Sequence, residues 1–454
     1  MLQSSFVKYD NRVMTLWTPR LHDSETPLYQ RIADALERDI ATGMLLAGSR
    51  LPTHRELARQ LGVTAVTITR AYAEAARRGL VESTTGRGSF VRNVRREAQA
   101  PAEELDLATN MLRIPLAPLA QAMLQRMNAA FVAAQYESPA GSERHRAAGA
   151  AWLGGGADPS NVVITAGAQQ AMFVALAALT RPGDTVLTES VTYHGIRWIA
   201  SLLHLRLEPL PMDRYGLIPD AIRKTKAKVV YVTPSIQNPT GTVLPEKRRR
   251  ELAAIAEKLG LTIVEDDVYA FLLDDPPPPV QSFAPERTVR VTGTGKSLAP
   301  ALRTGFALAP DALVPKMHAG LRAAALFTSP ALVEIAATWI EDGTAMRIVE
   351  QKRQEIALRN RLARKILGSR AGGGDPRSPH LWMEVPRRWT GDSFAEEARR
   401  RKVLVTSAST FSVADDSPRH IRICLGAAQT IAEMETALHV LAGIDEERAE
   451  GPVV

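Results

Sequence analysis

The sequence lacks cysteine pairs and long apolar runs, and each absence excludes a class of protein. Cys424 is the only cysteine among 454 residues, so a fold held together by disulfides within the chain is excluded. The purest apolar run, residues 171–179, is far shorter than the roughly 20 residues that span a bilayer. The start of the chain, Met1–Asp10, lacks the basic and apolar segments of a secretory signal. We therefore expect a soluble cytoplasmic protein with no membrane partner.

What the chain does contain is typical of a globular protein with several domains. Hydrophobic residues make up 45% and charged residues 23%, which excludes a disordered or collagen-like chain. At about 150 residues per domain, the length allows about three compact units. The net charge is +7, and basic residues clearly outnumber acidic ones between Arg50 and Arg92. This stretch is a candidate surface for an anionic partner such as a phosphate backbone.

The residue pattern before position 92 predicts three helices and a β-hairpin. Leucine and isoleucine recur every four residues within Pro27–Gly43, with charged residues between them, as in an amphipathic helix. Two shorter helices follow: Thr53 begins one, with Glu56 placed for a capping box, and Thr64 can cap the other. The segment Leu80–Val91 contains a glycine turn between two short strands. This order of elements is typical of a winged helix-turn-helix.

The second short helix carries the candidate DNA contacts of this domain. A helix-turn-helix lays this helix in the major groove, and polar residues near its start reach bases and phosphates. The candidates are Thr64, Thr67 and Arg70, with Arg55 on the preceding helix and Arg87 at the tip of the wing. From the spacing alone, a structural pair of helices with a solvated basic face is the alternative.

The stretch Leu51–Val91 resembles the winged helix-turn-helix of GntR-type bacterial repressors over its whole length. The resemblance implies binding to double-stranded DNA by the residues at matching positions, which are Arg55, Thr64, Thr67, Arg87 and Gly88. Members of the family often place a basic or polar residue directly after the position of Thr64, where this chain has Ala65 and Val66. We therefore expect base recognition there to be less polar or to depend on other residues.

A polar segment rich in alanine and glutamate, Asn93–Leu107, is expected to link two domains. The predicted boundaries are 1–92 for the winged helix-turn-helix domain, 93–107 for the linker and 108–454 for the second domain. In the second domain, helical stretches separate short apolar runs, which are Val162–Thr165, Asp184–Thr188, Lys228–Thr233, Thr262–Glu265 and Thr288–Thr292. This alternation predicts an α/β fold with a mostly parallel sheet, in a large lobe to about 345 and a smaller α/β lobe over about 346–454.

Several short motifs of the second domain carry residues suited to a binding site, although each alone has an ordinary structural interpretation. A Gly-Ala-Gln turn at a helix start can bind an anion, but Asn-Pro-Thr-Gly is commonly a turn and a lone lysine is commonly a solvated charge. In chain order, the motif residues are Gly167, Ala168, Gln169, Tyr193, Asn238, Asp266, Tyr269, Lys296, Arg303 and Arg422. Their order resembles that of the aspartate-aminotransferase superfamily of fold-type I pyridoxal-phosphate enzymes.

The resemblance implies how these residues would hold pyridoxal 5′-phosphate. Lys296 would form the Schiff base and Asp266 would pair with the pyridinium nitrogen, which makes these two the catalytic residues. Asn238 and Tyr269 would hold the phenolic oxygen, and Tyr193 would stack on the ring. The phosphate would be bound at Gly167, Ala168, Gln169 and Arg303.

Two further residues of the resemblance concern a partner subunit and a ligand. Tyr136 matches the tyrosine that reaches the phosphate of the neighbouring subunit, which implies a homodimer. Arg422 matches the arginine that grips the α-carboxylate of a substrate in a bidentate pair, so it would bind the carboxylate of a substrate or effector. No motif predicts a metal site.

The residues just before Lys296 depart from the superfamily pattern. Members usually have a serine or threonine three residues before the lysine, as a phosphate ligand, and often a serine directly before it. This chain has Gly293 and Gly295 at those positions, with Thr294 between them. Either Thr294 takes over through a shifted loop, or the phosphate is held more weakly than usual.

A GntR-like domain followed by an aminotransferase-like domain resembles the MocR subfamily of bacterial transcriptional regulators. The resemblance implies a pyridoxal-phosphate-dependent regulator whose second domain senses an amine, an amino acid or vitamin B6. The ligand would bind at the domain interface of a head-to-tail dimer and change the spacing of the two DNA-binding domains. Two alternatives stay open: a working aminotransferase that carries a DNA-binding tether, and a regulator that senses the cofactor alone.

Overall fold

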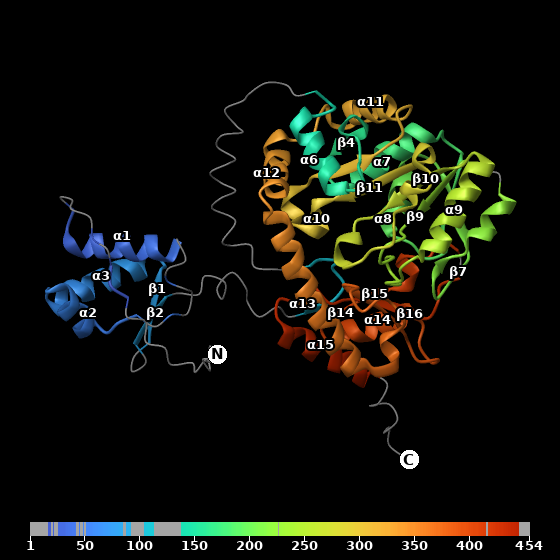
Figure 1. Ribbon diagram of the computed structural model, residues 1–454. Helices are drawn as coiled ribbons and strands as arrows, with labels where there is room; N and C mark the ends of the chain where they lie inside the picture. The colour runs from blue at the N-terminus through green and yellow to red at the C-terminus, as the bar shows by residue number, and fades with distance from the viewer. Residues whose placement is uncertain are drawn as a thin grey trace, which may run out of the picture. The chain divides into compact units, whose positions relative to one another are not determined.

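The computed structural model describes residues 17–19, 21, 26–41, 45, 49, 51–84, 88–91, 104–112, 138–225, 227–414 and 416–444. The chain divides into two compact units, Met1–Glu103 and Glu104–Val454. Figure 1 shows the first unit in blue and the second in colours from teal to red. No helix within the described ranges is both long enough and apolar enough to cross a membrane.

The first unit contains three helices and a hairpin, as the sequence predicts. The elements are α1 (Leu28–Ala41), α2 (His54–Leu61), α3 (Ala65–Arg77), β1 (Val81–Thr84) and β2 (Gly88–Val91). The two strands pair antiparallel, with Val81 opposite Val91. Apolar side chains from all five elements are buried in one core, which includes Ile32, Leu36, Leu57, Ile68, Val81 and Val91.

Trp17 adds to this core from the segment before α1, for which the sequence predicts no role. Its side chain is 6% exposed, and its indole nitrogen donates to Oδ2 of Asp39 over 2.9 Å. A buried indole N–H usually has such a hydrogen-bond partner. No periodic pattern surrounds Trp17 in the sequence, so only the structure shows that the core extends to it.

The predicted caps of α2 and α3 are present. The Thr53 hydroxyl accepts from the Glu56 amide over 3.3 Å, and the Glu56 carboxylate accepts from the Thr53 amide over 2.8 Å, which completes the capping box. The Thr64 hydroxyl accepts from the Thr67 amide over 3.2 Å at the start of α3. Because these bonds fix where both helices begin, they define the turn that presents α3.

A seven-stranded sheet forms the centre of the second unit. Its strands, in order across the sheet, are β4 (Val162–Thr165), β12 (Gly305–Leu308), β11 (Thr288–Gly293), β10 (Thr262–Asp266), β9 (Val229–Val232), β5 (Thr185–Glu189) and β6 (Arg206–Leu210). All neighbours pair in parallel except β12, which is antiparallel to both β4 and β11. The five predicted strands match five of these, and the sequence missed β6 and β12. The predicted mostly parallel sheet is therefore confirmed.

Helices cover both faces of this sheet (Figure 1). They are α6 (Glu143–Leu153), α7 (Ala168–Leu179), α8 (His194–Leu202), α9 (Glu246–Leu259), α10 (Thr294–Ser297), α11 (Val314–Ala325) and α12 (Pro330–Glu341), with a small hairpin of β7 (Met212–Asp213) and β8 (Gly216–Leu217). Residues of α7, α8 and α11 form one buried cluster with the sheet, and residues of α9 form another on the opposite face. The carboxyl ends of the parallel strands are thereby left open at one edge, where such sheets bind ligands.

The smaller lobe has its own antiparallel sheet, in the order β13 (His380–Glu384), β16 (His420–Cys424) and β15 (Thr406–Ser407). Its helices are α13 (Thr344–Leu367), α14 (Gly391–Arg400) and α15 (Ile431–Gly443). The long helix α13 packs against both lobes, because Ile348 lies in a cluster with Leu298 whereas Ile356 lies in the core of the smaller lobe. A separate pair of short parallel strands joins β3 (Leu105–Asp106) to β14 (Val403–Leu404).

The strand β3 corrects the predicted extent of the linker. The amide of Leu105 donates to the carbonyl of Lys402 over 2.7 Å. The amide of Leu107 donates to the carbonyl of Leu404 over 2.9 Å, and the Leu107 side chain is fully buried. Residues 104–107 therefore belong to the second unit. The sequence did not show this because the partner strand lies far along the chain.

Replacing Thr53 with alanine removes the hydroxyl that accepts from the Glu56 amide. We expect Thr53→Ala to destabilise α2 by about 1 kcal/mol, the usual effect of losing an N-cap. Hydrogen exchange of the α2 amides in the full-length protein measures this loss. Thr53→Ser is the matched control, since serine keeps the acceptor, and equal exchange in both variants would contradict the prediction.

Candidate functional site

Most of the predicted site residues line one cavity of about 240 Å³ in the second unit. The cavity lies where β10 and β11 end and where α7 begins. The predicted residues among its lining are Gly167, Ala168, Gln169, Tyr193, Asn238, Asp266, Tyr269, Lys296 and Arg303. Motifs that are far apart in the sequence are therefore brought together at the open edge of the sheet.

Asp266, the last residue of β10, places a buried carboxylate at this cavity. Its Oδ2 accepts from the Tyr231 hydroxyl over 2.7 Å, whereas its Oδ1 has no hydrogen-bond partner within the described residues. Burial raises the pKa of Asp266 to about 6, against the opposing effect of the Tyr231 hydrogen bond. A buried carboxylate whose second oxygen lacks a hydrogen-bond donor can accept a hydrogen bond from a positively charged ring N–H.

Lys296 extends into the same cavity from the short helix α10. Burial lowers the pKa of its amine to about 8, and the Arg422 charge acts in the same direction. The amine donates to the backbone carbonyl of Asn110. A lysine with a lowered pKa is neutral, and therefore nucleophilic, in a larger fraction of molecules near neutral pH.

A second lysine, Lys352 of α13, donates a hydrogen bond to the backbone of Lys296. The sequence does not predict this contact. The Lys352 amine is buried and donates to the carbonyls of Lys296 and Leu298, over 2.7 and 2.8 Å. Burial lowers the pKa of Lys352 to about 7. The sequence of α13 contains many charged residues, so nothing in it distinguishes Lys352 from the solvated ones.

The start of α7, where the sequence predicts that the phosphate binds, also lines the cavity. Gly167 has φ 92°, and a Cβ atom there would lie 3.2 Å from Nη2 of Arg303. This glycine therefore lets the Arg303 guanidinium approach the backbone, where it donates to the carbonyl of Ala166 over 3.1 Å. The amides of Ala168 and Gln169 point from the helix N-terminus and have no acceptor within the described residues.

Tyr193 lies against the backbone of Gly195 at the start of α8. A Cβ atom at Gly195 would come within 2.3 Å of Cε1 of Tyr193, so only glycine leaves room for the ring. Burial raises the pKa of Tyr193 to about 12, and its phenol therefore stays protonated. The ring is available at the cavity as the flat surface that the sequence predicts.

Arg422, on β16 of the smaller lobe, does not line the cavity itself but contacts Asn238, which does. Its Nη1 donates to Oδ1 of Asn238 over 3.0 Å, and its Nη2 donates to the carbonyl of Ala108 over 2.8 Å. The guanidinium lies over the Phe411 ring, 4.6 Å from its centroid. Its Nε is buried and has no acceptor at hydrogen-bond distance within the described residues.

One predicted residue, Thr294, does not line this cavity. The hydroxyl of Thr294 is fully buried and donates to the carbonyl of Thr304 over 3.0 Å, which corrects the prediction that it binds the phosphate. Thr294 is the first residue of α10, and only its neighbours Gly293 and Gly295 line the cavity. Tyr136 lies outside the described residues.

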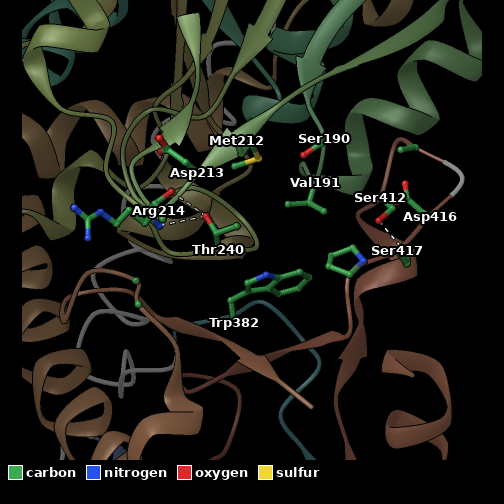
Figure 2. Close-up of a pocket in the computed structure, with 15 residues that line it drawn as sticks. Ser190, Val191, Met212, Asp213, Arg214, Thr240, Trp382, Ser412, Asp416 and Ser417 are labelled. Carbon is green, nitrogen blue, oxygen red and sulfur yellow. Dashed lines mark hydrogen bonds between the residues drawn. The ribbon is translucent and has the colours of Figure 1, made fainter. Parts of the chain in front are cut away.

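A second cavity, of about 560 Å³, lies between the two lobes of the second unit. Figure 2 shows the Trp382 indole facing Val191 and Ser190 across it. The edge of the Trp382 ring meets Phe411 with 6.0 Å between centroids, and Phe411 in turn supports Arg422. Among the described residues, none of those predicted for the site lines this cavity, yet an aromatic pair joins its wall to Arg422.

The predicted DNA contacts of the first unit lie on α2 and α3. Arg55 and Arg70 are exposed, and neither forms an ion pair within the part of the chain that the structure describes. The hydroxyls of Thr64 and Thr67 are 2.9 Å apart at the start of α3. Val66, next to them, is 63% exposed and presents an apolar side chain at the start of α3. Arg87 lies outside the described residues, and Gly88 begins β2.

The basic excess of this unit is smaller at its surface than in its sequence. Arg77 donates to Glu74 over 2.7 Å. Arg78 donates to Glu74, Asp34 and Glu37, over 2.9, 2.6 and 2.8 Å. Arg78 therefore joins the end of α3 to α1, whereas Arg77 pairs within α3. Exposed arginines that form no ion pair within the described residues include Arg55 on α2 and Arg70 on α3.

Comparison with known proteins identifies both units. The family of aminotransferase class I and II matches residues 102–441, and the gntR family of bacterial regulatory proteins matches residues 28–91. The HTH-type transcriptional regulator YdeF of Bacillus subtilis is 29% identical and covers 95% of this chain and 97% of its own. The pyridoxine biosynthesis regulator PdxR of Corynebacterium glutamicum is 27% identical, over 63% of this chain and 66% of its own.

Solved structures show the same fold in the second unit. The kynurenine aminotransferase of Pyrococcus horikoshii superimposes with a TM-score of 0.71 at 21% identity, over 77% of this chain and 93% of that one. The fold and the site together define an aminotransferase-like domain joined to a winged helix-turn-helix. The chain belongs to the aminotransferase class I and II family and, through its GntR-type domain, to the MocR-type transcriptional regulators. This family implies DNA binding and dependence on pyridoxal phosphate.

The two glycines before Lys296 differ in the room that surrounds them. A Cβ atom at Gly295 would meet only Pro300, at 4.0 Å, whereas one at Gly293 would lie 3.2 Å from the Ala168 amide. We expect Gly295→Ser to add a phosphate donor and to tighten pyridoxal phosphate binding about fivefold, the effect of one ordinary hydrogen bond. Gly293→Ser is the matched control and should weaken binding. Equal cofactor dissociation constants for the two variants would contradict the prediction.

The lowered pKa of Lys296 predicts how cofactor uptake depends on pH. The neutral fraction of the amine grows as the pH rises through about 8. The rate at which cofactor-free protein takes up pyridoxal phosphate, followed by visible absorbance, should therefore rise across this pH range. Lys296→Arg is the control, because it keeps the charge but cannot form the covalent bond. A rate that falls as the pH rises would contradict the assignment of Lys296.

Proposed function

We propose that this protein is a pyridoxal-phosphate-dependent transcriptional regulator that binds a small amine or amino acid and changes its affinity for DNA in response. One observation carries the proposal. The cavity holds a lysine of lowered pKa and a buried carboxylate, and the Arg422 guanidinium contacts Asn238 of its lining. The same chain carries a GntR-type DNA-binding unit.

The described residues fit pyridoxal phosphate. Lys296 would hold it covalently, and the unmatched Oδ1 of Asp266 would accept the ring N–H. Asn238 and Tyr269 would hold its phenolic oxygen, and its phosphate would be bound by the start of α7 with Arg303. When bound, the cofactor supplies an electron-withdrawing ring and a carbonyl carbon that reacts with primary amines.

The chain's own residues then select the ligand. Arg422 would bind a carboxylate of the ligand, in the bidentate arrangement that arginine favours. Asp266 is ionised above about pH 6, so it would stabilise positive charge on the ring nitrogen of the cofactor. A ligand that carries both an amine and a carboxylate therefore meets both ends of the site.

In the proposed function, the exposed residues of α2 and α3 in the first unit contact DNA. Arg55 and Arg70 supply exposed charge for phosphates, and Thr67 and Val66 lie where α3 would meet base edges. Regulators with this reading helix commonly bind two half-sites as dimers, so we propose a homodimer in which Tyr136 reaches the partner's cofactor. A protein that binds promoter DNA in a bacterium works in the cytoplasm.

A working aminotransferase is the second candidate, because Lys296, Asp266 and Arg422 are all in place. An amino-acid transaminase needs the same three groups. The two functions differ in their products, since a sensor binds its ligand reversibly whereas a transaminase converts amino acids to 2-oxo acids over many turnovers.

The first test is an absorption spectrum of the full-length protein loaded with pyridoxal phosphate. We expect a panel of amines, amino acids and pyridoxine-related compounds to contain one that shifts the spectrum without repeated release of a 2-oxo acid. The same compound should change the affinity for a duplex selected by the protein from a random DNA pool. Multiple turnovers with no effect on DNA binding would instead establish the aminotransferase.

The second test concerns the DNA contacts. Arg55→Ala removes one exposed cation, so it should weaken binding to the selected duplex and lower the slope of log affinity against log salt by about 1. Arg77→Ala is the matched control, because Arg77 is paired with Glu74. An unchanged salt slope in Arg55→Ala, or an equal loss in both variants, would contradict the assignment.

A further inference from the structure

The cavity between the two lobes of the second unit is larger than the cavity that contains Lys296. Its volume is about 560 Å³, against about 240 Å³. Cavities of this size bind small molecules in many proteins. The large lobe lines it with the loop after β5, the β7–β8 hairpin and the loop after Asn238, and the smaller lobe lines it with β13 and the loops before β13 and β16.

Hydrogen bonds between the lobes fix the width of this cavity on one side. Val191 of the large lobe forms an antiparallel bridge with Ser412 of the smaller lobe. Next to this bridge, the amide of Val413 donates to the carbonyl of Ser190 over 3.0 Å. Because Ser190, Val191 and Ser412 all line the cavity, these bonds hold its walls at a set distance.

The loop before β13 joins the lobes on another side of the cavity. The amide of Asp375 donates to the carbonyl of Gly241 over 2.8 Å. A Cβ atom at Gly374 would lie 2.7 Å from the Thr240 carbonyl, so only glycine allows this close approach. A Cβ atom at Gly373, which also lines the cavity, would meet nothing within 4 Å. The cavity is therefore a preformed space, with room beside Gly373.

Trp382 gives the cavity an aromatic surface. Figure 2 shows its indole facing the large lobe across the cavity. The His420 imidazole stacks on the same indole, with 5.1 Å between the ring centroids and 11° between the planes. Burial lowers the pKa of His420, so this imidazole is neutral near pH 7 and does not repel a cation. Indole rings attract cations and pack against other flat rings.

The charges around the cavity favour a cation. Asp416 is exposed on the loop before β16 and forms no ion pair within the described residues. The Asp213 carboxylate is neutralised by Arg248, whose Nη1 and Nη2 donate to its two oxygens over 2.7 and 2.6 Å. The Arg214 guanidinium lies over the Tyr215 ring, 4.6 Å from its centroid, and Figure 2 shows it directed away from the cavity.

The hydroxyl groups of the lining act mainly as acceptors. The Thr240 hydroxyl donates to Oε1 of Gln237 over 2.7 Å, so it accepts from the Thr242 hydroxyl, 2.9 Å away. The Ser417 hydroxyl donates to the Ser412 hydroxyl over 2.9 Å. The hydrogens of Thr242 and Ser417 are thus engaged, while their lone pairs can accept from the N–H groups of a ligand.

We propose that the cavity between the lobes is a second ligand site, which binds a small aromatic compound that carries a protonated amine. The ring packs on Trp382, and the positive charge faces Asp416. Among the described residues, none that would hold the cofactor lines this cavity. The proposal therefore does not rest on the proposed function.

Benzyltrimethylammonium is the probe for a calorimetric titration of the full-length, cofactor-loaded protein. It offers a flat ring and a fixed positive charge, yet it can neither react with the carbonyl of the cofactor nor bind Arg422 as a carboxylate. We expect saturable binding, and we expect Lys296→Ala to retain it, because Lys296 does not line this cavity. No saturable binding at millimolar concentrations, or its loss in Lys296→Ala, would overturn the proposal.

Gly373→Leu places a side chain in the open space of the cavity. We expect it to weaken binding of the probe about tenfold, since the ligand must then compete with the added carbon atoms for the same space. Gly443→Leu is the matched control, because a Cβ atom there also meets nothing within 4 Å and Gly443 does not line this cavity. Equal dissociation constants for the two variants would show that the probe binds elsewhere.

Two further variants test the ligand class. Trp382→Leu should weaken binding of the probe about tenfold through the loss of the aromatic face, and Trp382→Phe should restore part of it. Benzyl alcohol has the same ring without a charge, and the wild type should bind it more weakly than the probe. Asp416→Asn should reduce this preference about threefold, the effect of one exposed ion pair. An unchanged preference would show that the cavity does not select a cation, and the proposal would be wrong.

Discussion

The site of the second unit depends on two buried groups of opposite charge, Asp266 and Lys296, at one edge of the sheet. Burial moves the pKa of Asp266 up to about 6 and that of Lys296 down to about 8. Asp266 is ionised above the first value and Lys296 is protonated below the second, so both carry charge only in the interval between them. Tyr231 and Lys352 hold the two groups there, one through the carboxylate and the other through the backbone of α10.

The smaller lobe contributes Arg422 to the site, whereas Asp266 and Lys296 both belong to the large lobe. Arg422 comes from the smaller sheet and reaches the cavity through Asn238, which belongs to the large lobe. The helix α13 packs on both lobes and supplies Lys352. Any ligand that binds Arg422 and Lys296 together therefore acts on the contact between the lobes, and β3 places the chain from the DNA-binding unit on one of them.

The sequence predicts the parts of this structure that depend on local pattern. The caps at Thr53 and Thr64, five strands and the motif residues of the cavity all follow from spacing or resemblance. What it does not predict depends on contacts between distant segments. Lys352 and Asn110 look like ordinary polar residues until tertiary packing buries one and places the other at Lys296. A count of charges along the sequence does not show which arginines are paired, because two partners of Arg78 lie on another helix.

The aromatic pair Trp382 and Phe411 has a consequence for how the protein can be observed. Trp382 borders one cavity, and its ring meets Phe411, on which the Arg422 guanidinium rests. Indole emission responds to nearby charge and to the packing of its neighbours. A carboxylate that draws Arg422 away from Phe411 would therefore alter the fluorescence of Trp382. The protein contains its own optical reporter for the occupancy of the arginine.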